Sequence, residues 1–180
     1  MQYTTYYDSP LGKMLLAADH GELTGLWFEN QKYYGATLDR QQQRRGDLPI
    51  FIQTKDWLDR YFAGEKPEIA EIPLGPAGSS FRKQVWKLLC EIPYGTVVTY
   101  GDIAREMSKC LGKNMSAQAV GGAVGHNPVS IIIPCHRVVG AKGNLTGYAG
   151  GIARKEKLLE LEGMDMTGLF APPEKGVLGK

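Results

Sequence analysis

The sequence predicts an α+β fold in which strands come first and helices follow. Residues 3–28 contain short apolar and aromatic stretches separated by turn residues, which is typical of a meander of strands. After residue 49, apolar residues recur at helical spacing. A run of small residues and turn formers at 75–79 separates the two patterns and marks the expected domain boundary. At 180 residues with 43% hydrophobic content, the chain can bury a real core.

Residues 1–75 are predicted to form an antiparallel sheet and one helix. Three strands are expected, at residues 3–7, 13–18 and 23–28. Residues 49–62 place apolar side chains on one side of a helix, and residues 69–74 are expected to add a short strand. Because no polar residues group in a catalytic pattern here, we interpret this part as a scaffold domain.

Residues 79–163 are predicted to form a second, mostly helical domain. Thr99, with Asp102 three residues later, is a variant capping box for a helix that ends near residue 107. After a loop, Ser116 caps a further helix over residues 117–125. Two short helices joined by a Gly-containing connection predict a helix-turn-helix, although this connection is longer than the usual tight turn.

Two more helices complete the second domain. One begins with Ser80 as its cap, and the other covers residues 152–161 and ends at Gly163. Residues 164–180 contain Pro and Gly without periodicity, so we expect a flexible tail.

The helix at 117–125 has almost no side-chain bulk. Gly121, Gly122 and Gly125 each cost about 1 kcal/mol relative to Ala within a helix. Close approach of the backbone to a partner, such as a DNA groove, explains this composition, and tight packing against another helix explains it equally well. The sequence does not decide between them.

An apolar run leads into Cys135, which we interpret as a reactive thiol. Pro134 fixes the backbone before it, and His136 and Arg137 place two potential cations beside the sulfur, which favours thiolate. The segment is expected to be a buried strand or extended. The alternative is that Cys135 is a small core residue, because free Cys is often buried for packing alone.

Charge and cysteine usage narrow the class of protein. Residues 1–79 hold 8 Lys and Arg against 11 Asp and Glu, whereas residues 80–163 hold 11 against 6, which suggests polyanion binding near Cys135. No apolar run is long enough to cross a membrane, and no signal peptide is evident. Three scattered cysteines fit free thiols in a reducing cytoplasm better than disulfides, and the scattered His residues argue against zinc.

The block Pro134-Cys135-His136-Arg137 resembles the O6-alkylguanine-DNA alkyltransferase family, the methylated-DNA–protein-cysteine methyltransferases. The resemblance extends from about residue 81 to residue 163. Its other motifs are residues 92–100, 119–121, 127–128 and 147–151. It implies a ribonuclease H-like N-terminal sheet with a helix, followed by a helical domain that carries a helix-turn-helix and the active Cys segment.

The resemblance also implies catalytic roles. Cys135 would be the nucleophile and alkyl acceptor, and His136 would take the thiol proton through a water. Glu162 would orient His136. Asn127 would brace the turn before the Cys segment, and Tyr148 would donate to the guanine O6.

DNA binding is implied for six residues: Tyr100, Gln118, Ala119, Gly121, Gly122 and Arg137. The flipped base would be lined by Val138, Ala149, Tyr148 and Tyr100. The implied reaction is transfer from O6-alkylguanine in double-stranded DNA, approached through the minor groove, with one turnover per molecule. O4-alkylthymine is a further possible substrate, no cofactor or metal is implied, and a monomer is expected.

Gln118 departs from the family, which commonly has Arg at this position. Gln can fill the place of the flipped base but adds no charge to a phosphate-rich groove, so we expect weaker flipping with intact chemistry. Two other functions were considered. A DNA-binding module without chemistry is disfavoured by Cys135, and a Cys–His hydrolase by the adjacency of Cys135 and His136, whose side chains would point apart on an extended segment.

Overall fold

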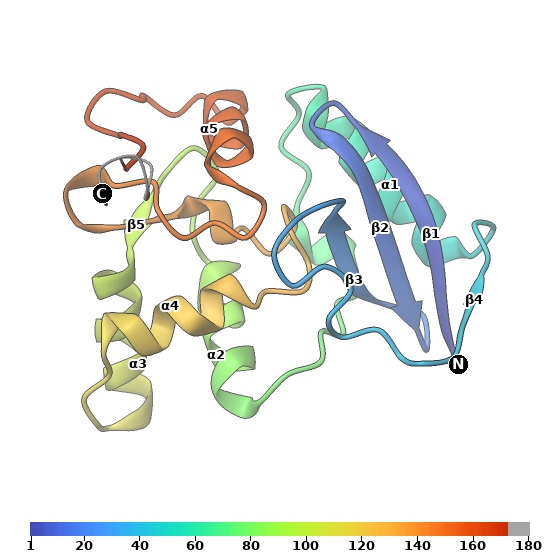
Figure 1. Cartoon of the computed structure of the whole chain (residues 1–180), viewed down its shortest axis with the longest axis horizontal. Coiled ribbons are helices and arrows are strands. Elements are labelled where there is room, and N and C mark those ends of the chain that lie inside the picture. Colours follow the sequence, from blue (N-terminus) through green and yellow to red (C-terminus); the bar gives the residue numbers. More distant parts are fainter. Residues whose placement is uncertain (173–180) are drawn as a thin grey trace, which may run out of the picture.

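Strands β1 (Gln2–Ser9), β2 (Gly12–Asp19) and β3 (Glu22–Phe28) form the antiparallel meander that the sequence predicts. The structure is a computed structural model that describes residues 1–172. A short strand that was not expected, β4 (Gln42–Arg44), pairs parallel with β1, so the sheet order is β3-β2-β1-β4 (Figure 1).

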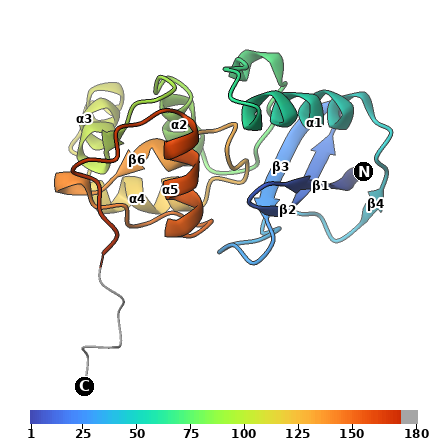
Figure 2. The same ribbon diagram turned by 90° about the horizontal axis from the view of Figure 1, so that it is seen from above.

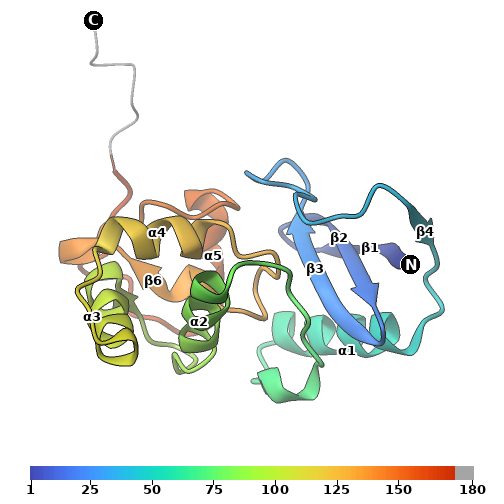
Figure 3. The same cartoon turned by 90° about the horizontal axis from the view of Figure 1, so that it is seen from below.

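Helix α1 (Pro49–Phe62) covers one face of this sheet, as Figures 2 and 3 show. It buries Phe51, Trp57, Leu58 and Tyr61 against the core. The strand expected at 69–74 is wrong for most of its length, because residues Ile69–Glu71 form a 3₁₀ turn, η1. Glu68 and Glu71 cap this turn reciprocally, which satisfies its backbone locally. Only Leu74 makes a bridge, with Leu23.

The second part of the chain contains α2 (Ser80–Leu89), α3 (Tyr100–Leu111), α4 (Ala117–Gly125) and α5 (Ile152–Leu161). The capping box of Thr99 with Asp102 and the cap at Ser116 are confirmed. The cap of α2 is Ser79 rather than Ser80. Helix α3 continues to Leu111, past the predicted end near residue 107, because Gly112 supplies the left-handed residue that stops it.

The segment before Cys135 joins the two parts by pairing with the outer edge of β3. The Leu26 N–H donates to the Pro128 carbonyl, and the Ser130 N–H donates to the Leu26 carbonyl. Strands β5 (Val98–Thr99) and β6 (Val138–Val139) form a small parallel pair on either side of this segment in the sequence. A single hydrophobic cluster runs through both parts. The Cys segment is therefore held against the sheet and the helices together.

The described part of the expected tail differs from the prediction. Met164, Met166 and Leu169 pack against a small cluster with Val139 and Leu159. The Leu145 N–H donates to the Phe170 carbonyl, and the Phe170 N–H donates to the Gly143 carbonyl. Residues 164–170 are thus fixed by apolar contacts that no periodic pattern announced, and residues 173–180 lie outside the described range. No helix in residues 1–172 is long and apolar enough to cross a membrane.

Candidate active site

Cys135 begins a 3₁₀ turn, η2 (Cys135–Arg137), rather than lying on the extended segment that was expected. Asn127 fixes the backbone that leads into it. Its side-chain amide donates to the carbonyls of Ile133 (2.9 Å) and Val129 (3.3 Å), and its side-chain oxygen accepts from the Val129 N–H (3.0 Å). A buried loop needs such partners for its backbone groups, so Asn127 takes the bracing position that the resemblance implied.

The Cys135 side chain is almost completely buried, at 5% exposed. Burial raises the pKa of its thiol, and the Asn127 amide followed by the Lys155 ammonium partly offsets that effect. The prediction that His136 and Arg137 stabilise a thiolate is wrong, because both side chains are turned to another partner. The resting sulfur is therefore held as a thiol and needs a base.

His136 provides a base of the required kind. It is fully buried, and its Nε2 lies 2.7 Å from Oε2 of Glu162. Burial lowers the pKa of His136 more than Glu162 raises it, so the ring is neutral. Since a carboxylate only accepts, Nε2 carries the hydrogen and Nδ1 is an acceptor. Within residues 1–172 this Nδ1 has no hydrogen-bond partner.

Glu162 follows the last residue of α5 and collects donors from distant parts of the chain. Arg137 donates through Nε (2.8 Å) and Nη2 (3.1 Å), and the Tyr61 hydroxyl donates at 2.6 Å. Burial alone would raise the pKa of this carboxyl, but His136 and then Arg137 outweigh it and hold the pKa well below its usual range. Glu162 is therefore a carboxylate that fixes the orientation of His136.

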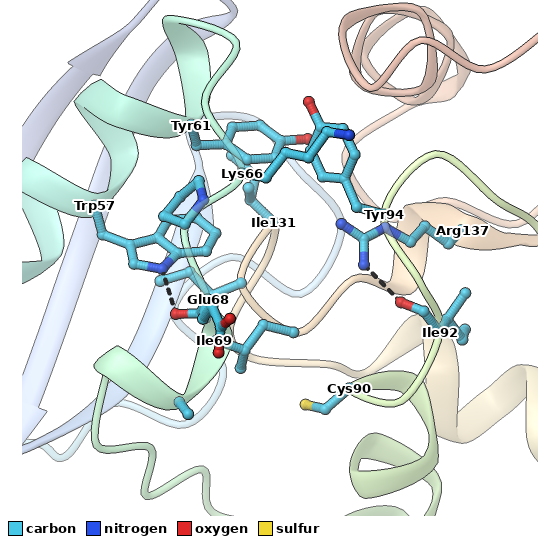
Figure 4. A pocket seen from close by; sticks show the side chains of 13 residues that line it. Trp57, Tyr61, Lys66, Glu68, Ile69, Cys90, Ile92, Tyr94, Ile131 and Arg137 are labelled. Atoms are coloured by element: carbon cyan, nitrogen blue, oxygen red, sulfur yellow. Dashed lines mark hydrogen bonds between the residues drawn. The ribbon is translucent and has the colours of Figure 1, made fainter.

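Arg137 does not lie on a DNA-binding surface, which corrects that prediction. Its guanidinium is buried and also donates to the Ile92 carbonyl at 2.8 Å. Figure 4 shows this bond at one side of a cavity of about 350 Å³, with Tyr61 and Tyr94 nearby. A buried carboxylate needs a cation beside it, and Arg137 meets that need for Glu162 instead of facing a phosphate.

Two residues of the site were missed by sequence reasoning. Tyr61 comes from α1, 101 residues from Glu162, and no local pattern links them. Lys155 is completely buried in α5 and donates to the carbonyls of Val138 and Thr146, and burial lowers its pKa to about 8. A signal for Lys155 was present, because it shares the helix face of Leu158 and Leu159.

Two adjoining hollows lie between α4 and the loop before α5. The first, about 400 Å³, is lined by Tyr100, Ala117, Gln118, Gly121, Thr146 and Gly147. The second, about 330 Å³, is lined by Gly121, Gly122, Gly125, His126, Gly147, Tyr148, Ala149, Lys32 and Tyr33. They share Gly121 and Gly147. The Tyr100 hydroxyl donates to the Thr146 carbonyl at 3.1 Å, and a side chain at Gly147 would collide with that hydroxyl.

The glycines of α4 face open space. A Cβ added at Gly122 or Gly125 would meet nothing within 4 Å, and at Gly121 only the Tyr100 ring at 3.9 Å. Gln118 and Ala119 are exposed on the same helix. Tight helix packing therefore does not explain Gly121, Gly122 and Gly125, and close approach of a partner stays the prediction for them.

Tyr148 lines the second hollow and lies near Cys135. Its hydroxyl is buried without a hydrogen-bond partner in residues 1–172. Burial, and then the nearby Cys135, raise its pKa well above the usual value, so it keeps its proton. Ala149 lines the same hollow, whereas Val138 lines neither and its carbonyl is occupied by Lys155. The site thus combines a buried thiol, a neutral base and an uncommitted hydroxyl donor.

Two family models match the chain. The ribonuclease-like domain of 6-O-methylguanine DNA methyltransferase matches residues 2–76, and its DNA-binding domain matches residues 80–164. The methylated-DNA–protein-cysteine methyltransferase of Haemophilus influenzae is 41% identical over 160 residues, covering 89% of this chain and 86% of its own. The Mycobacterium tuberculosis protein of that name is 45% identical over 155 residues, 86% of this chain and 88% of its own.

A solved structure of Mycobacterium tuberculosis OGT in complex with DNA has a similar fold. Its TM-score is 0.79 at 42% identity, and the match covers 89% of this chain and 93% of that one. The α+β fold that the sequence predicts, with its sheet followed by a helical DNA-binding domain, is confirmed by these matches.

Proposed function

Because the chain belongs to the O6-methylguanine DNA methyltransferase family, we propose that Cys135 is the cysteine that receives the alkyl group. The chain is an enzyme of DNA repair that transfers an alkyl group from methylated DNA to a cysteine of the protein. The observation that carries the assignment is the neutral His136, which follows Cys135 in the turn η2, is fixed by Glu162 and has an uncommitted Nδ1. Burial raises the pKa of Cys90 to about 11, and Cys110 is exposed.

The proton of the Cys135 thiol passes to Nδ1 of His136 through one water, as base catalysis requires. The sulfur then attacks the alkyl carbon, a carbon–sulfur bond forms, and the carbon–O6 bond breaks. Tyr148 gives its proton to the departing guanine and is reprotonated at the expense of the proton held on His136. The buried, uncommitted hydroxyl of Tyr148 supports this role.

The product is a thioether, which these residues have no means of cleaving. We therefore expect one turnover for each molecule. Mass spectrometry after reaction with excess methylated duplex should find one added methyl group, on Cys135. Repeated turnover would contradict the proposal.

Labelled methyl transfer from duplex DNA tests the assignment of the acceptor. Cys135→Ser should take up no label, because its hydroxyl is a far weaker nucleophile than a thiol. Cys90→Ser is the matched control and should retain the stoichiometry of the wild type. Label on the Cys135→Ser protein would place the acceptor elsewhere.

The DNA approaches α4, and the alkylated base leaves the stack to reach the buried sulfur. The open glycine face of α4 supports a minor-groove approach with the two hollows receiving the base. Tyr100 stands at the first hollow, where it can crowd a phosphate and assist rotation of the base. Gln118 fills the gap left in the duplex.

Gln118→Arg tests the role given to α4. An Arg at this exposed position adds a cation beside the phosphates, so transfer from duplex DNA should become faster, with no gain on the free alkylated base. Equal rates on duplex would refute the weak-flipping hypothesis. We also infer a cytoplasmic location, which the three free cysteines support.

A further inference from the structure

The loop that follows β3 extends from the N-terminal sheet to the end of α4. The Lys32 N–H donates to the Ala149 carbonyl at 3.0 Å, beside Tyr148. The Tyr33 ring stacks on His126, the C-cap of α4, with ring centroids 3.9 Å apart and planes inclined by 24°. Lys32 and Tyr33 also line the second hollow. Two contacts thus fix this loop at the border of the hollow.

Buried Gln31 holds the start of this loop, and Tyr33 has an unfavourable backbone conformation. Gln31 is buried, and its Oε1 accepts a hydrogen bond from the Ser130 hydroxyl at 3.3 Å. Tyr33 has φ +61°, a left-handed conformation that is unfavourable for a bulky residue. A strained residue that remains exposed at the edge of a binding site indicates that its position matters more than its local energy.

Helix α4, against which this loop lies, offers no side-chain charge to a partner. Helix α4 contains no charged residue, and its C-terminal end carries the negative end of the helix dipole. The Lys32 side chain is exposed, with Nζ 5.3 Å from the centroid of the Tyr33 ring. No ion pair within residues 1–172 includes Lys32. Its ammonium group therefore lies over the Tyr33 ring without a carboxylate partner, near a helix that carries no charge.

We propose that Lys32 binds a backbone phosphate of the DNA strand that lies along α4, and that Tyr33 positions Lys32 for this contact. The N-terminal domain then takes part in DNA binding directly. Its loop supplies the cation that α4 lacks, while the stack on His126 keeps the ammonium at the border of the hollow. The inference rests on the proposed approach of DNA to α4.

The salt dependence of binding to undamaged duplex DNA tests this contact. Each phosphate contact contributes about 0.9 to the slope of log affinity against log salt concentration. Lys32→Gln should reduce the magnitude of the slope by about one. Lys32→Arg should keep it. Lys66→Gln is the matched control, because Lys66 lines the cavity beside Tyr94 and Arg137 (Figure 4) and neither hollow of α4, and it should leave the slope unchanged.

Two further measurements separate positioning from a general effect on folding. Tyr33→Ala should weaken duplex binding, whereas Tyr33→Phe should bind as the wild type does, because Phe keeps the ring. Lys32→Gln should raise the duplex concentration needed for half-maximal alkyl transfer, whereas Lys66→Gln should leave that concentration unchanged. An unchanged slope in Lys32→Gln, or an equal change in Lys66→Gln, would overturn the proposal. If the wild type transferred no alkyl group, the proposed function would fail, whereas the slope comparison would still judge the Lys32 contact.

Discussion

The two sides of Cys135 are built in opposite ways. On one side, His136, Arg137, Glu162 and Tyr61 are buried and joined by hydrogen bonds of 2.6–3.1 Å. On the other side, glycines leave α4 open and the Tyr148 hydroxyl has no partner in residues 1–172. We call the first the relay side and the second the groove side.

The comparison shows that the relay side is fully formed in the free protein, whereas the groove side is not. On the relay side each charge has its counter-charge, so the base is oriented before any substrate arrives, and little reorganisation is needed during the reaction. On the groove side the hollows along α4 are open and the Tyr148 hydroxyl has no hydrogen-bond partner in residues 1–172, so a bound partner would complete this side. Two buried polar atoms of the site have no hydrogen-bond partner in residues 1–172: Nδ1 of His136, in the turn that begins with Cys135, and the hydroxyl of Tyr148, which lies near Cys135.

The largest expected effect comes from breaking the relay side. Glu162→Gln leaves Arg137 buried without a counter-charge, which should destabilise the fold by about 3–5 kcal/mol. Urea denaturation at neutral pH measures this change. Glu160→Gln, which affects an exposed carboxylate 3.8 Å from Lys157, should change stability by less than about 0.5 kcal/mol. Similar losses in both variants would contradict the special status of Glu162.

A change on the groove side should lower the rate without lowering stability. Tyr148→Phe removes the proposed donor, and alkyl transfer should slow by about 100-fold. Because the lost hydroxyl is buried and unpartnered, the free energy of unfolding should stay level or rise by about 1 kcal/mol. Single-turnover kinetics and urea denaturation give the two values. A variant that loses stability in parallel with its rate would erase the distinction between the two sides.

Acid should act mainly on the relay side. Burial lowers the pKa of His136 below its ordinary 6.5, so protonating it penalises the folded state at lower pH. The pKa of Glu162 is held below its ordinary 4.5, so the stability it contributes is present above that pH and is lost as the pH falls through the folded pKa. In both cases the native state binds fewer protons than the unfolded chain. Stability should therefore fall as the pH drops from 6.5 toward 4, and Glu162→Gln should flatten the lower part of that profile.

The smallest expected effect comes from adding a methyl group to a glycine on the groove side. Gly122→Ala should stabilise the free protein by up to about 1 kcal/mol, because the added Cβ meets nothing and Ala favours the helix. The same methyl group should weaken binding to duplex DNA, since it occupies the space left for the partner. Thermal unfolding and duplex titration measure the two effects. Gly112→Ala is the control for a glycine needed for its backbone, at φ +66°, and should destabilise instead.

The strands, the caps at Thr99 and Ser116 and the last helix were predictable because their signals are local. The motif around Cys135 also placed His136 beside the sulfur. The partners of Glu162 were not all predictable, because Tyr61 reaches it only after α1 has packed on the sheet and the two parts of the chain have come together. The partner of Arg137 was not predictable either, because Glu162 lies 25 residues away in the sequence and meets Arg137 only in the folded chain. From the sequence, the charge of Arg137 was assigned to the thiol or to DNA.

The bond from Tyr61 to Glu162 makes the N-terminal part a component of the proposed relay. Together with the pairing of Leu26 to the segment before Cys135, it links the chemistry to an element that carries no reacting group. The two parts are consequently not exchangeable modules. A chimera that receives its first 75 residues from a relative should support alkyl transfer only if the donor brings both a Tyr at position 61 and a strand edge that accepts the Cys segment.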